Sequence, residues 1–166
     1  MPTFYGTAEL QRAITAVWNA SAINAAFKAY WTEPQKGLFD VLHFGEAGPS
    51  QPWPYCVYII PVSRKSIGMA GRDRDSRREI RNTMVEFHVF AKAVTTTSGA
   101  ELCAAMADQV RQVYGGHPTA TPTPVPGTVR VQPGDEYPAR AGDDEYKWIL
   151  KYLMRADLRQ ATVQAS

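Results

Sequence analysis

Residues 83–113 read TMVEFHVFAKAVTTTSGAELCAAMADQVRQV and carry the clearest structural pattern in the chain. The first nine of these residues alternate in character, and alternate side chains of a strand lie on opposite faces. Val85, Phe87 and Val89 would therefore form a purely apolar face, opposite a mixed face that carries Glu86 and His88. The alternation predicts a strand over residues 83–91 that is covered on one side.

The second half of the same stretch has the pattern of a helix. Ser98 precedes Glu101 by three residues, the spacing at which a hydroxyl and a carboxylate satisfy each other's free backbone amides at a helix start. A helix is therefore expected from Gly99. Apolar residues follow at helical intervals, and they would cover the Val85/Phe87/Val89 face: Leu102, Cys103, Met106, Val110 and Val113.

Length and composition indicate a single domain over residues 1–166, with 45% hydrophobic residues to fill a core. The chain holds no run of eighteen apolar residues and no signal-peptide pattern, so we expect no membrane contact and a cytosolic origin. Cys56 and Cys103 match neither a disulfide framework nor a zinc motif, and free thiols are expected. The net charge of +2 gives no global reason to expect tight nucleic-acid binding.

The first half of the chain predicts helices followed by strands. Apolar spacing indicates helices over residues 7–19 and 22–30, and Pro34 is expected to stop further helix. A brief strand over 39–44 and a Pro- and Gly-containing loop come next. Residues 55–62 are apolar on both sides, which is typical of a strand in the centre of a sheet.

Residues 64–81 break this pattern with a cluster of basic side chains. The segment contains seven cationic and three anionic residues, a local net charge of +4, and it has few apolar residues that could anchor it in a core. A long loop between two strands is predicted, which either contacts a partner or DNA in a channel or is only a soluble surface loop. The candidate contact residues are Arg64, Lys65, Arg72, Arg74, Arg77, Arg78 and Arg81.

The segments that follow the central helix differ in stiffness. Residues 115–127 are rich in Pro and Gly and predict a stiff, extended connector. A short strand is expected over 128–132, with a turn at 133–135. Residues 160–166 are expected to form a flexible tail.

The last strand is the longest in the prediction. Its alternation runs over residues 146–159, which would span ~46 Å, far more than a typical strand. Part of it is therefore expected to project beyond its own sheet and to be covered by a neighbouring subunit, unless a bend near Arg155 shortens it. The predicted subunit interface consists of Ile149, Lys151, Leu153 and Arg155.

Candidate catalytic and metal-binding residues are scattered. His43, His88 and His117 have no HxH or HExxH spacing, and the acidic residues 143–145 form an isolated triplet. We therefore expect no catalytic site, cofactor or metal. One alternative is a small ligand-binding or hydrolytic protein whose pocket uses His43, His88 and the triplet, and another is a nucleic-acid binder that uses the 64–81 loop.

Four segments in this order carry a resemblance to a known family: PYCVYIIPV at 54–62, TMVEFHVFA at 83–91, SGAELCAAMADQV at 98–110 and YKWILKYLMRADL at 146–158. The chain resembles the tail terminator proteins of long-tailed bacteriophages, also called minor tail or tail completion proteins, over roughly residues 10–159. The resemblance implies an α+β fold with a mixed, largely antiparallel sheet, helices packed on one face and a long loop between strands. It implies no catalytic residues.

The same resemblance implies a structural role in the virion. Such proteins form a ring of six on the last ring of tail-tube subunits, end tube polymerisation and offer the surface that joins the head. The implied partners are further copies of the chain, the tail tube protein, the head-tail connector or stopper protein, and non-specific DNA in the lumen. The implied location is the head-proximal end of the tail, after assembly in the host cytoplasm. A head-side completion or stopper protein of the connector is the related alternative.

Overall fold

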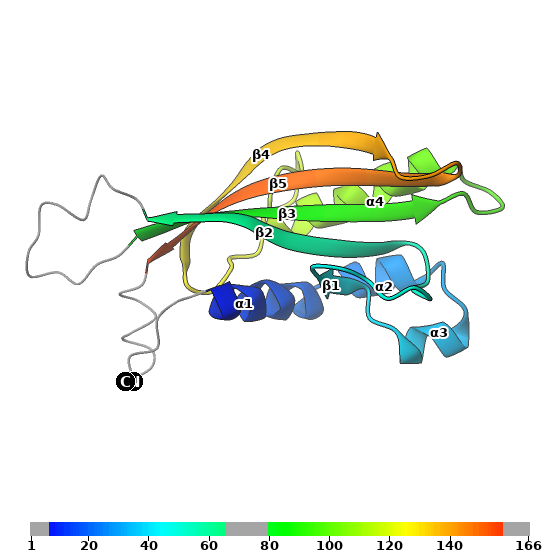
Figure 1. The fold of residues 1–166 in the computed structure, drawn as a ribbon, viewed down its shortest axis with the longest axis horizontal. Helices are drawn as coiled ribbons and strands as arrows, with labels where there is room; N and C mark the ends of the chain where they lie inside the picture. The colour runs from blue at the N-terminus through cyan, green and yellow to red at the C-terminus, as the bar shows by residue number, and fades with distance from the viewer. Residues whose placement is uncertain (1–6, 66–79, 158–166) are drawn as a thin grey trace, which may run out of the picture.

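The computed structural model describes residues 7–65 and 80–157. Its strands are β1 (Leu42–Phe44), β2 (Tyr55–Lys65), β3 (Ile80–Lys92), β4 (Thr128–Arg140) and β5 (Glu145–Asp157), shown in Figure 1. They form one sheet in the order β1-β2-β3-β5-β4, in which only the β1–β2 pair is parallel. The predicted α+β class with a mixed, largely antiparallel sheet is confirmed.

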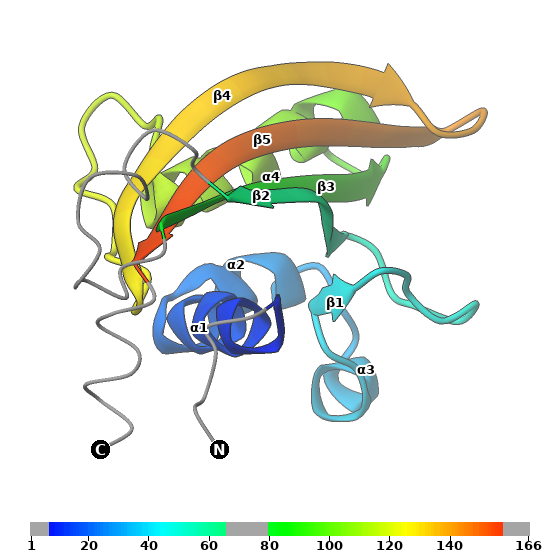
Figure 2. The same ribbon diagram turned by 60° about the vertical axis from the view of Figure 1, so that its left-hand side comes forward.

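The helices that build the core pack on one face of this sheet. They are α1 (Thr7–Ala20), α2 (Ile23–Lys28) and α4 (Gly99–Tyr114), and α1 and α2 lie beneath the curved sheet in Figure 2. The ring of Phe87 stacks on Trp18 of α1 at 6.3 Å and on Tyr114 of α4 at 4.6 Å. Both helices therefore cover the face that carries Phe87. We call this the covered face and the opposite one the open face.

The sequence pattern of β3 and α4 is reproduced residue by residue. Val85, Phe87 and Val89 are fully buried, and so is the predicted apolar stripe of α4. The helix starts at Gly99 because Ser98 Oγ accepts the amide of Glu101 at 3.2 Å while Glu101 Oε2 accepts the amide of Ser98 at 3.3 Å. The predicted strand, helix and capping box are all confirmed.

A helix that the sequence analysis excluded is present between α2 and β1. α3 (Glu33–Leu38) begins at the position where Pro34 was expected to end helical structure. Proline lacks an amide donor, but the first turn of a helix needs none, and its fixed φ suits that turn. Pro34 therefore lies in the first turn of a new helix and does not prevent helix formation in this region.

The last strand does not project beyond its sheet. β5 pairs along its whole length with β3, from Glu145 opposite Lys92 to Asp157 opposite Ile80, and on its other side with β4. The predicted overhang is wrong within the described residues, and no bend at Arg155 shortens the strand. The reason is that both neighbours are as long as β5, at thirteen residues each.

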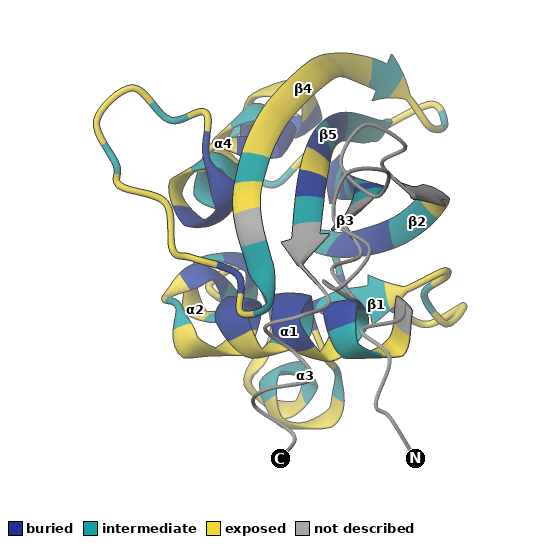
Figure 3. Ribbon diagram, turned by 90° about the vertical axis from the view of Figure 1, so that its left-hand side faces the viewer, coloured by how far each residue is buried: buried dark blue, intermediate teal, exposed yellow. Residues whose placement is uncertain are grey.

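The turn predicted at residues 133–135 is also wrong. β4 continues through Pro133 and Gly134 with a shift in register before Glu136, and the chain turns at residues 141–144 instead. A bulge absorbs the proline and glycine because β4 is an edge strand, where a missing donor breaks no ladder. Figure 3 shows β4 exposed along most of its length, as expected for an edge.

β2 lies one strand from the other edge rather than in the centre. Its outer neighbour is β1, which pairs only with Cys56 to Tyr58. β2 also extends past Pro61, with a register shift between Ile59 and Val62, and ends at Lys65. Residues 64–65 and 80–81 of the predicted loop therefore belong to strands, because β3 begins at Ile80, and the rest of the predicted loop lies outside the described residues.

Candidate assembly interface

The open face of the sheet holds the residues predicted to contact a neighbouring subunit. Ile149, Lys151, Leu153 and Arg155 alternate with the buried inward-facing residues of β5, so all of them lie on this face. No helix in the described part of the chain packs there, because the rings that contact α1 and α4 belong to the other face. The structure thus gathers the predicted interface residues on one surface.

These residues differ in how far they are available to a partner. Leu153 is 40% exposed, whereas Ile149 is only 5% exposed and already packs within the chain. Lys151 and Arg155 are half-buried. Tyr137 of β4, the register partner of Ile149, is 45% exposed and lies beside Lys151, whose Nζ is 5.6 Å from its ring centroid. Tyr137 was missed by the sequence analysis because its strand was expected to end before it.

We define the open-face patch as Tyr137, Ile149, Lys151 and Leu153. It combines a lysine with apolar groups, two of which are large and exposed. Tyr137 and Leu153 share this face, with Lys151 beside the ring of Tyr137 and two residues from Leu153. Exposed apolar residues gathered on one face are typical of a protein contact, whereas single ones are ordinary surface. This patch is the strongest candidate interface among the described residues.

A charged cluster lies next to the patch. Glu86 Oε2 is 3.0 Å from His88 Nε2, and its other carboxylate oxygen is 3.8 Å from Lys151 Nζ. The side chains of Glu86 and His88 are each less than a fifth exposed. Lys151 is thereby held between a carboxylate on β3 and an aromatic ring on β4.

An aromatic group forms the far end of the open face. Tyr55 and Phe90 are register partners whose rings stack at 4.9 Å, and Trp53 meets both edge-on at 5.0 and 6.1 Å. Lys92 Nζ lies 4.4 Å from the Trp53 ring centroid, and Lys147 Nζ lies 5.8 Å from that of Phe90. Sequence reasoning missed this group because its members come from separate segments that only the β2–β3 register brings together.

The predicted basic contact residues divide between strand ends and the undescribed segment. Arg64 and Lys65 are the last residues of β2, and Arg81 is the second residue of β3. Lys65 is the register partner of Arg81. Arg72, Arg74, Arg77 and Arg78 lie outside the described residues. Three of the basic positions therefore lie together at one end of the β2–β3 pair.

The residues of the alternative pocket are not brought together. His43 and His88 lie on β1 and β3, two strands apart, and the acidic triplet lies at the β4–β5 turn and the start of β5. His117 is in the connector, where its Nδ1 accepts the amides of Thr119 at 3.2 Å and Ala120 at 3.1 Å. Among the described residues no three His, Cys, Asp or Glu side chains form a group suited to a metal ion.

A small polar pocket lies elsewhere, between the helices and β1. Its volume is about 120 Å³, and it is lined by Thr15, Asn19, Asn24, Lys28, Asp40, Val41 and Leu42. Typical ligand pockets measure about 300–1,000 Å³ and are mostly apolar. Neither the histidines nor the acidic triplet of the alternative reading lines it.

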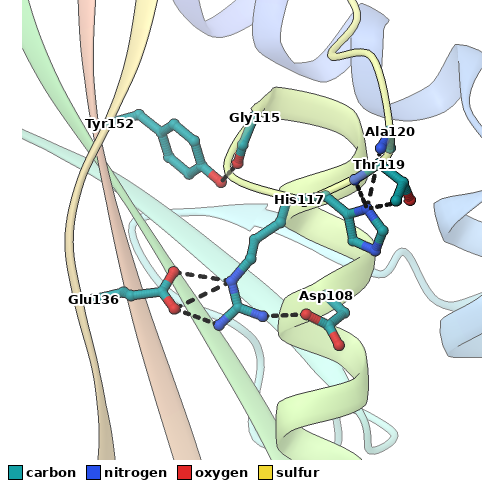
Figure 4. Close-up of polar contacts among 8 residues, drawn as sticks. Asp108, Gly115, His117, Thr119, Ala120, Glu136 and Tyr152 are labelled. Atoms are coloured by element: carbon teal, nitrogen blue, oxygen red, sulfur yellow. Dashed lines mark hydrogen bonds and ion pairs between the residues drawn. The ribbon is translucent and has the colours of Figure 1, made fainter.

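The edge strand is held against the covering helix by an ion pair, drawn in Figure 4. Arg111 of α4 donates from Nε to Glu136 of β4 at 2.9 Å and also pairs with Asp108. Its hydrogen bond to Glu136 is the main cause that raises the pKa of Arg111. Tyr152 donates to the carbonyl of Gly115 at 2.8 Å, which fixes the start of the connector. The edge strand that supplies Tyr137 is thus tied to the core.

No family model matches the sequence, and no curated protein matches it closely. Within the described residues, no helix has the length and apolarity that crossing a membrane requires.

Proposed function

We propose that the chain is a structural subunit that assembles into a ring, with the role of a tail terminator in a long-tailed phage. In this role the ring caps the tail tube, ends tube polymerisation and provides the surface to which the head is joined. The proposed partners are further copies of the chain, the tail tube protein and the head-tail connector or stopper protein. The proposed location is the head-proximal end of the tail.

The observation that carries the proposal is the open-face patch. An antiparallel sheet tolerates one solvated face, so an uncovered face alone would be ordinary. Here, however, Leu153 of the predicted interface exposes 40% of its surface, and Tyr137, which lies beside Lys151 on the same face, exposes 45%. Covering such groups on another protein removes apolar surface from water, which favours association.

The patch supports association, and the resemblance to tail terminators supports a ring as the symmetry of that association. Most homo-oligomers close by rotation, and a ring forms when one surface meets a different surface of the next copy. The resemblance of the chain to tail terminators supports a ring of six. The residues of the alternative pocket lie instead on separate elements, with His43 on β1, His88 on β3 and the acidic triplet at the β4–β5 turn and the start of β5.

Mass photometry and light scattering over a range of concentrations test the proposal, with the protein alone and mixed with tail tube protein. A ring is expected, and cryo-EM of the mixture should place it on the end of the tube. Monomers at every concentration, even with tube protein present, would contradict the proposal. Pull-down against tube protein and against the connector's adaptor distinguishes a tail terminator from a head-side completion protein.

The basic positions at the β2–β3 end suggest where DNA would be met in such a ring. Arg64, Lys65 and Arg81 lie together at this end, since Lys65 is the register partner of Arg81. Contact with phosphates makes binding fall with salt, with a logarithmic slope of about −0.9 for each phosphate neutralised on duplex DNA. Binding of the assembled ring to DNA is therefore expected to weaken steeply with salt, and a flat salt response would remove DNA from the list of partners.

A further inference from the structure

α3 is a helix that the described part of the chain leaves without a core. None of its six residues is buried, and its last residue, Leu38, is 78% exposed. The helix is held by the capping box between Thr32 and Gln35, by an ion pair from Lys36 to Glu33 at 2.7 Å, and by a hydrogen bond from Lys28 of α2 to the carbonyl of Lys36 at 2.9 Å. Because helices this short are marginal in water, α3 lacks the packing that normally stabilises one.

The position of α3 is opposite to that of the open-face patch. α3 leads into β1, which is one edge of the sheet, whereas Tyr137 belongs to β4, the other edge. In Figure 2, α3 protrudes below β1, and β4 lies at the opposite side of the molecule. Phe44, at the end of β1, is 47% exposed and adds a second apolar group on the α3 side. The subunit thus has exposed apolar residues at both edges of its sheet.

The β1 edge and the open face also differ in charge. Asp40 and Glu46, which flank β1, are exposed and form no ion pair within the described residues. The open face presents Lys147 and Lys151 instead. Lys151 lies 3.8 Å from Glu86 of its own subunit, whereas Lys147 forms no ion pair among the described residues. An acidic edge and a basic face attract each other, and complementary charges fix which surfaces meet.

We propose that α3 of one copy docks through Leu38 on the open-face patch of the next copy, with Asp40 and Glu46 directed toward its lysines. This inference rests on the proposed ring function and names the two surfaces that form each contact. The contact is head-to-tail, because α3 and the patch are different surfaces of the same subunit. A head-to-tail contact forms a ring when its rotation closes, whereas a self-complementary contact ends at a pair.

Two variants that damage opposite sides of the contact test this geometry. Leu38→Asp removes the docking side chain and leaves the patch intact, while Leu153→Asp does the reverse. Each variant replaces an apolar contact with a charged side chain and so loses the gain from burying apolar surface, which should raise the concentration needed for assembly by about tenfold or more. Sedimentation velocity should then show monomers for either variant alone at a concentration where the unmodified protein forms rings.

A mixture of the two variants gives the decisive result. The intact patch of Leu38→Asp can bind the intact α3 of Leu153→Asp, but the remaining surfaces of that pair are both damaged. A heterodimer that grows no further is therefore expected. A mixture that stays monomeric, or a Leu38→Asp variant that still forms rings, would overturn the head-to-tail contact.

Controls separate this inference from folding and from the proposed function. Tyr30→Asp changes an exposed apolar residue outside both surfaces, at 44% exposure, and should assemble normally. Tyr137→Asp, on the edge strand, replaces Leu153→Asp if circular dichroism shows that the latter is unfolded. If the unmodified protein and both the Leu38→Asp and Tyr137→Asp variants form rings, the proposed contact surfaces are refuted while the ring function stands. Unmodified protein that is monomeric even with tube protein would refute the function itself.

Discussion

The covered and open faces of β3 belong to one strand, yet they have different roles. Val85, Phe87 and Val89 point to the helices and are fully buried, while Glu86 and His88 point to the other side and are half-buried. The covered face is filled from α1 and α4 of the same chain. The open face is only partly screened by its own aromatic and charged side chains. Folding completes one face, and the proposed assembly completes the other.

Phe87→Ala should give the largest effect, on the covered face. The Phe87 ring contacts Trp18, Tyr114 and Tyr152, and its removal leaves a cavity between two helices and the sheet. The expected loss is about 3–5 kcal/mol in the free energy of unfolding, measured with urea. Such a loss is a large part of the stability of a typical domain.

Phe90→Ala is the matched control on the open face. Phe90 is half-buried, stacks on Tyr55 and meets Trp53 edge-on, so its removal costs mainly two aromatic pairs worth about 0.5–1.5 kcal/mol each, plus part of its burial. The cost should be smaller than that of Phe87→Ala. Equal losses would mean that both faces are equally packed, contrary to the structure.

Alkaline pH should weaken the covered face next. Burial raises the pKa of Cys103 from its ordinary 9.0 to about 12, and burial also raises the pKa of Cys56 and Tyr114. A raised pKa means that the unfolded chain loses its protons first. The stability from Cys103 is thus complete below about pH 9 and is lost as the pH rises toward 12.

Thermal unfolding at pH 8 and at about pH 10.5 measures this effect. The unmodified protein should lose about 1–2 kcal/mol through Cys103 alone, since each unit between the pKa values corresponds to about 1.4 kcal/mol. Cys103→Ala removes this thiol and should show a smaller fall between the two pH values. An identical fall in both proteins would exclude Cys103 as a cause.

Ser98→Ala should have a smaller effect, confined to the helix that covers the sheet. Ser98 Oγ accepts the amide of Glu101, and the substitution leaves that donor without its cap. A loss of about 1 kcal/mol in unfolding free energy is expected from urea denaturation. Thr95→Ala, in the exposed turn before the helix, is the matched control and should change stability by less than half as much.

Local rules were sufficient for β3 and α4 because the signals that define them lie within a few residues of each other. The alternation around Phe87 and the Ser98–Glu101 spacing need no knowledge of the rest of the chain. Pro34 shows the limit of such rules. Its chemistry suits either the end of one helix or the start of another, and only the neighbouring structure decides between these outcomes.

Properties that depend on neighbouring strands could not be predicted from the sequence. The length of β5 suggested an overhang, but whether a strand projects depends on the lengths of β3 and β4 beside it. The aromatic group of Trp53, Tyr55 and Phe90 likewise depends on the register of β2 with β3. By contrast, the face assigned to Ile149, Lys151 and Leu153 follows from alternation alone, and the structure confirms that they share it.

Glu86→Gln should have the smallest effect on the folded subunit, although Glu86 contacts two cationic partners on the open face. Its carboxylate is 3.0 Å from His88 and 3.8 Å from Lys151, and ion pairs near a surface contribute about 0–1 kcal/mol. The glutamine keeps the shape of the side chain, so urea denaturation should report a loss below about 1 kcal/mol.

The same change leaves Lys151 without its neighbouring carboxylate and makes the open-face patch more basic. If Asp40 and Glu46 of the next copy face these lysines, assembly should persist or strengthen in low salt while subunit stability hardly changes. Weaker assembly in low salt would show that Glu86 itself, rather than the lysines, meets the neighbouring subunit.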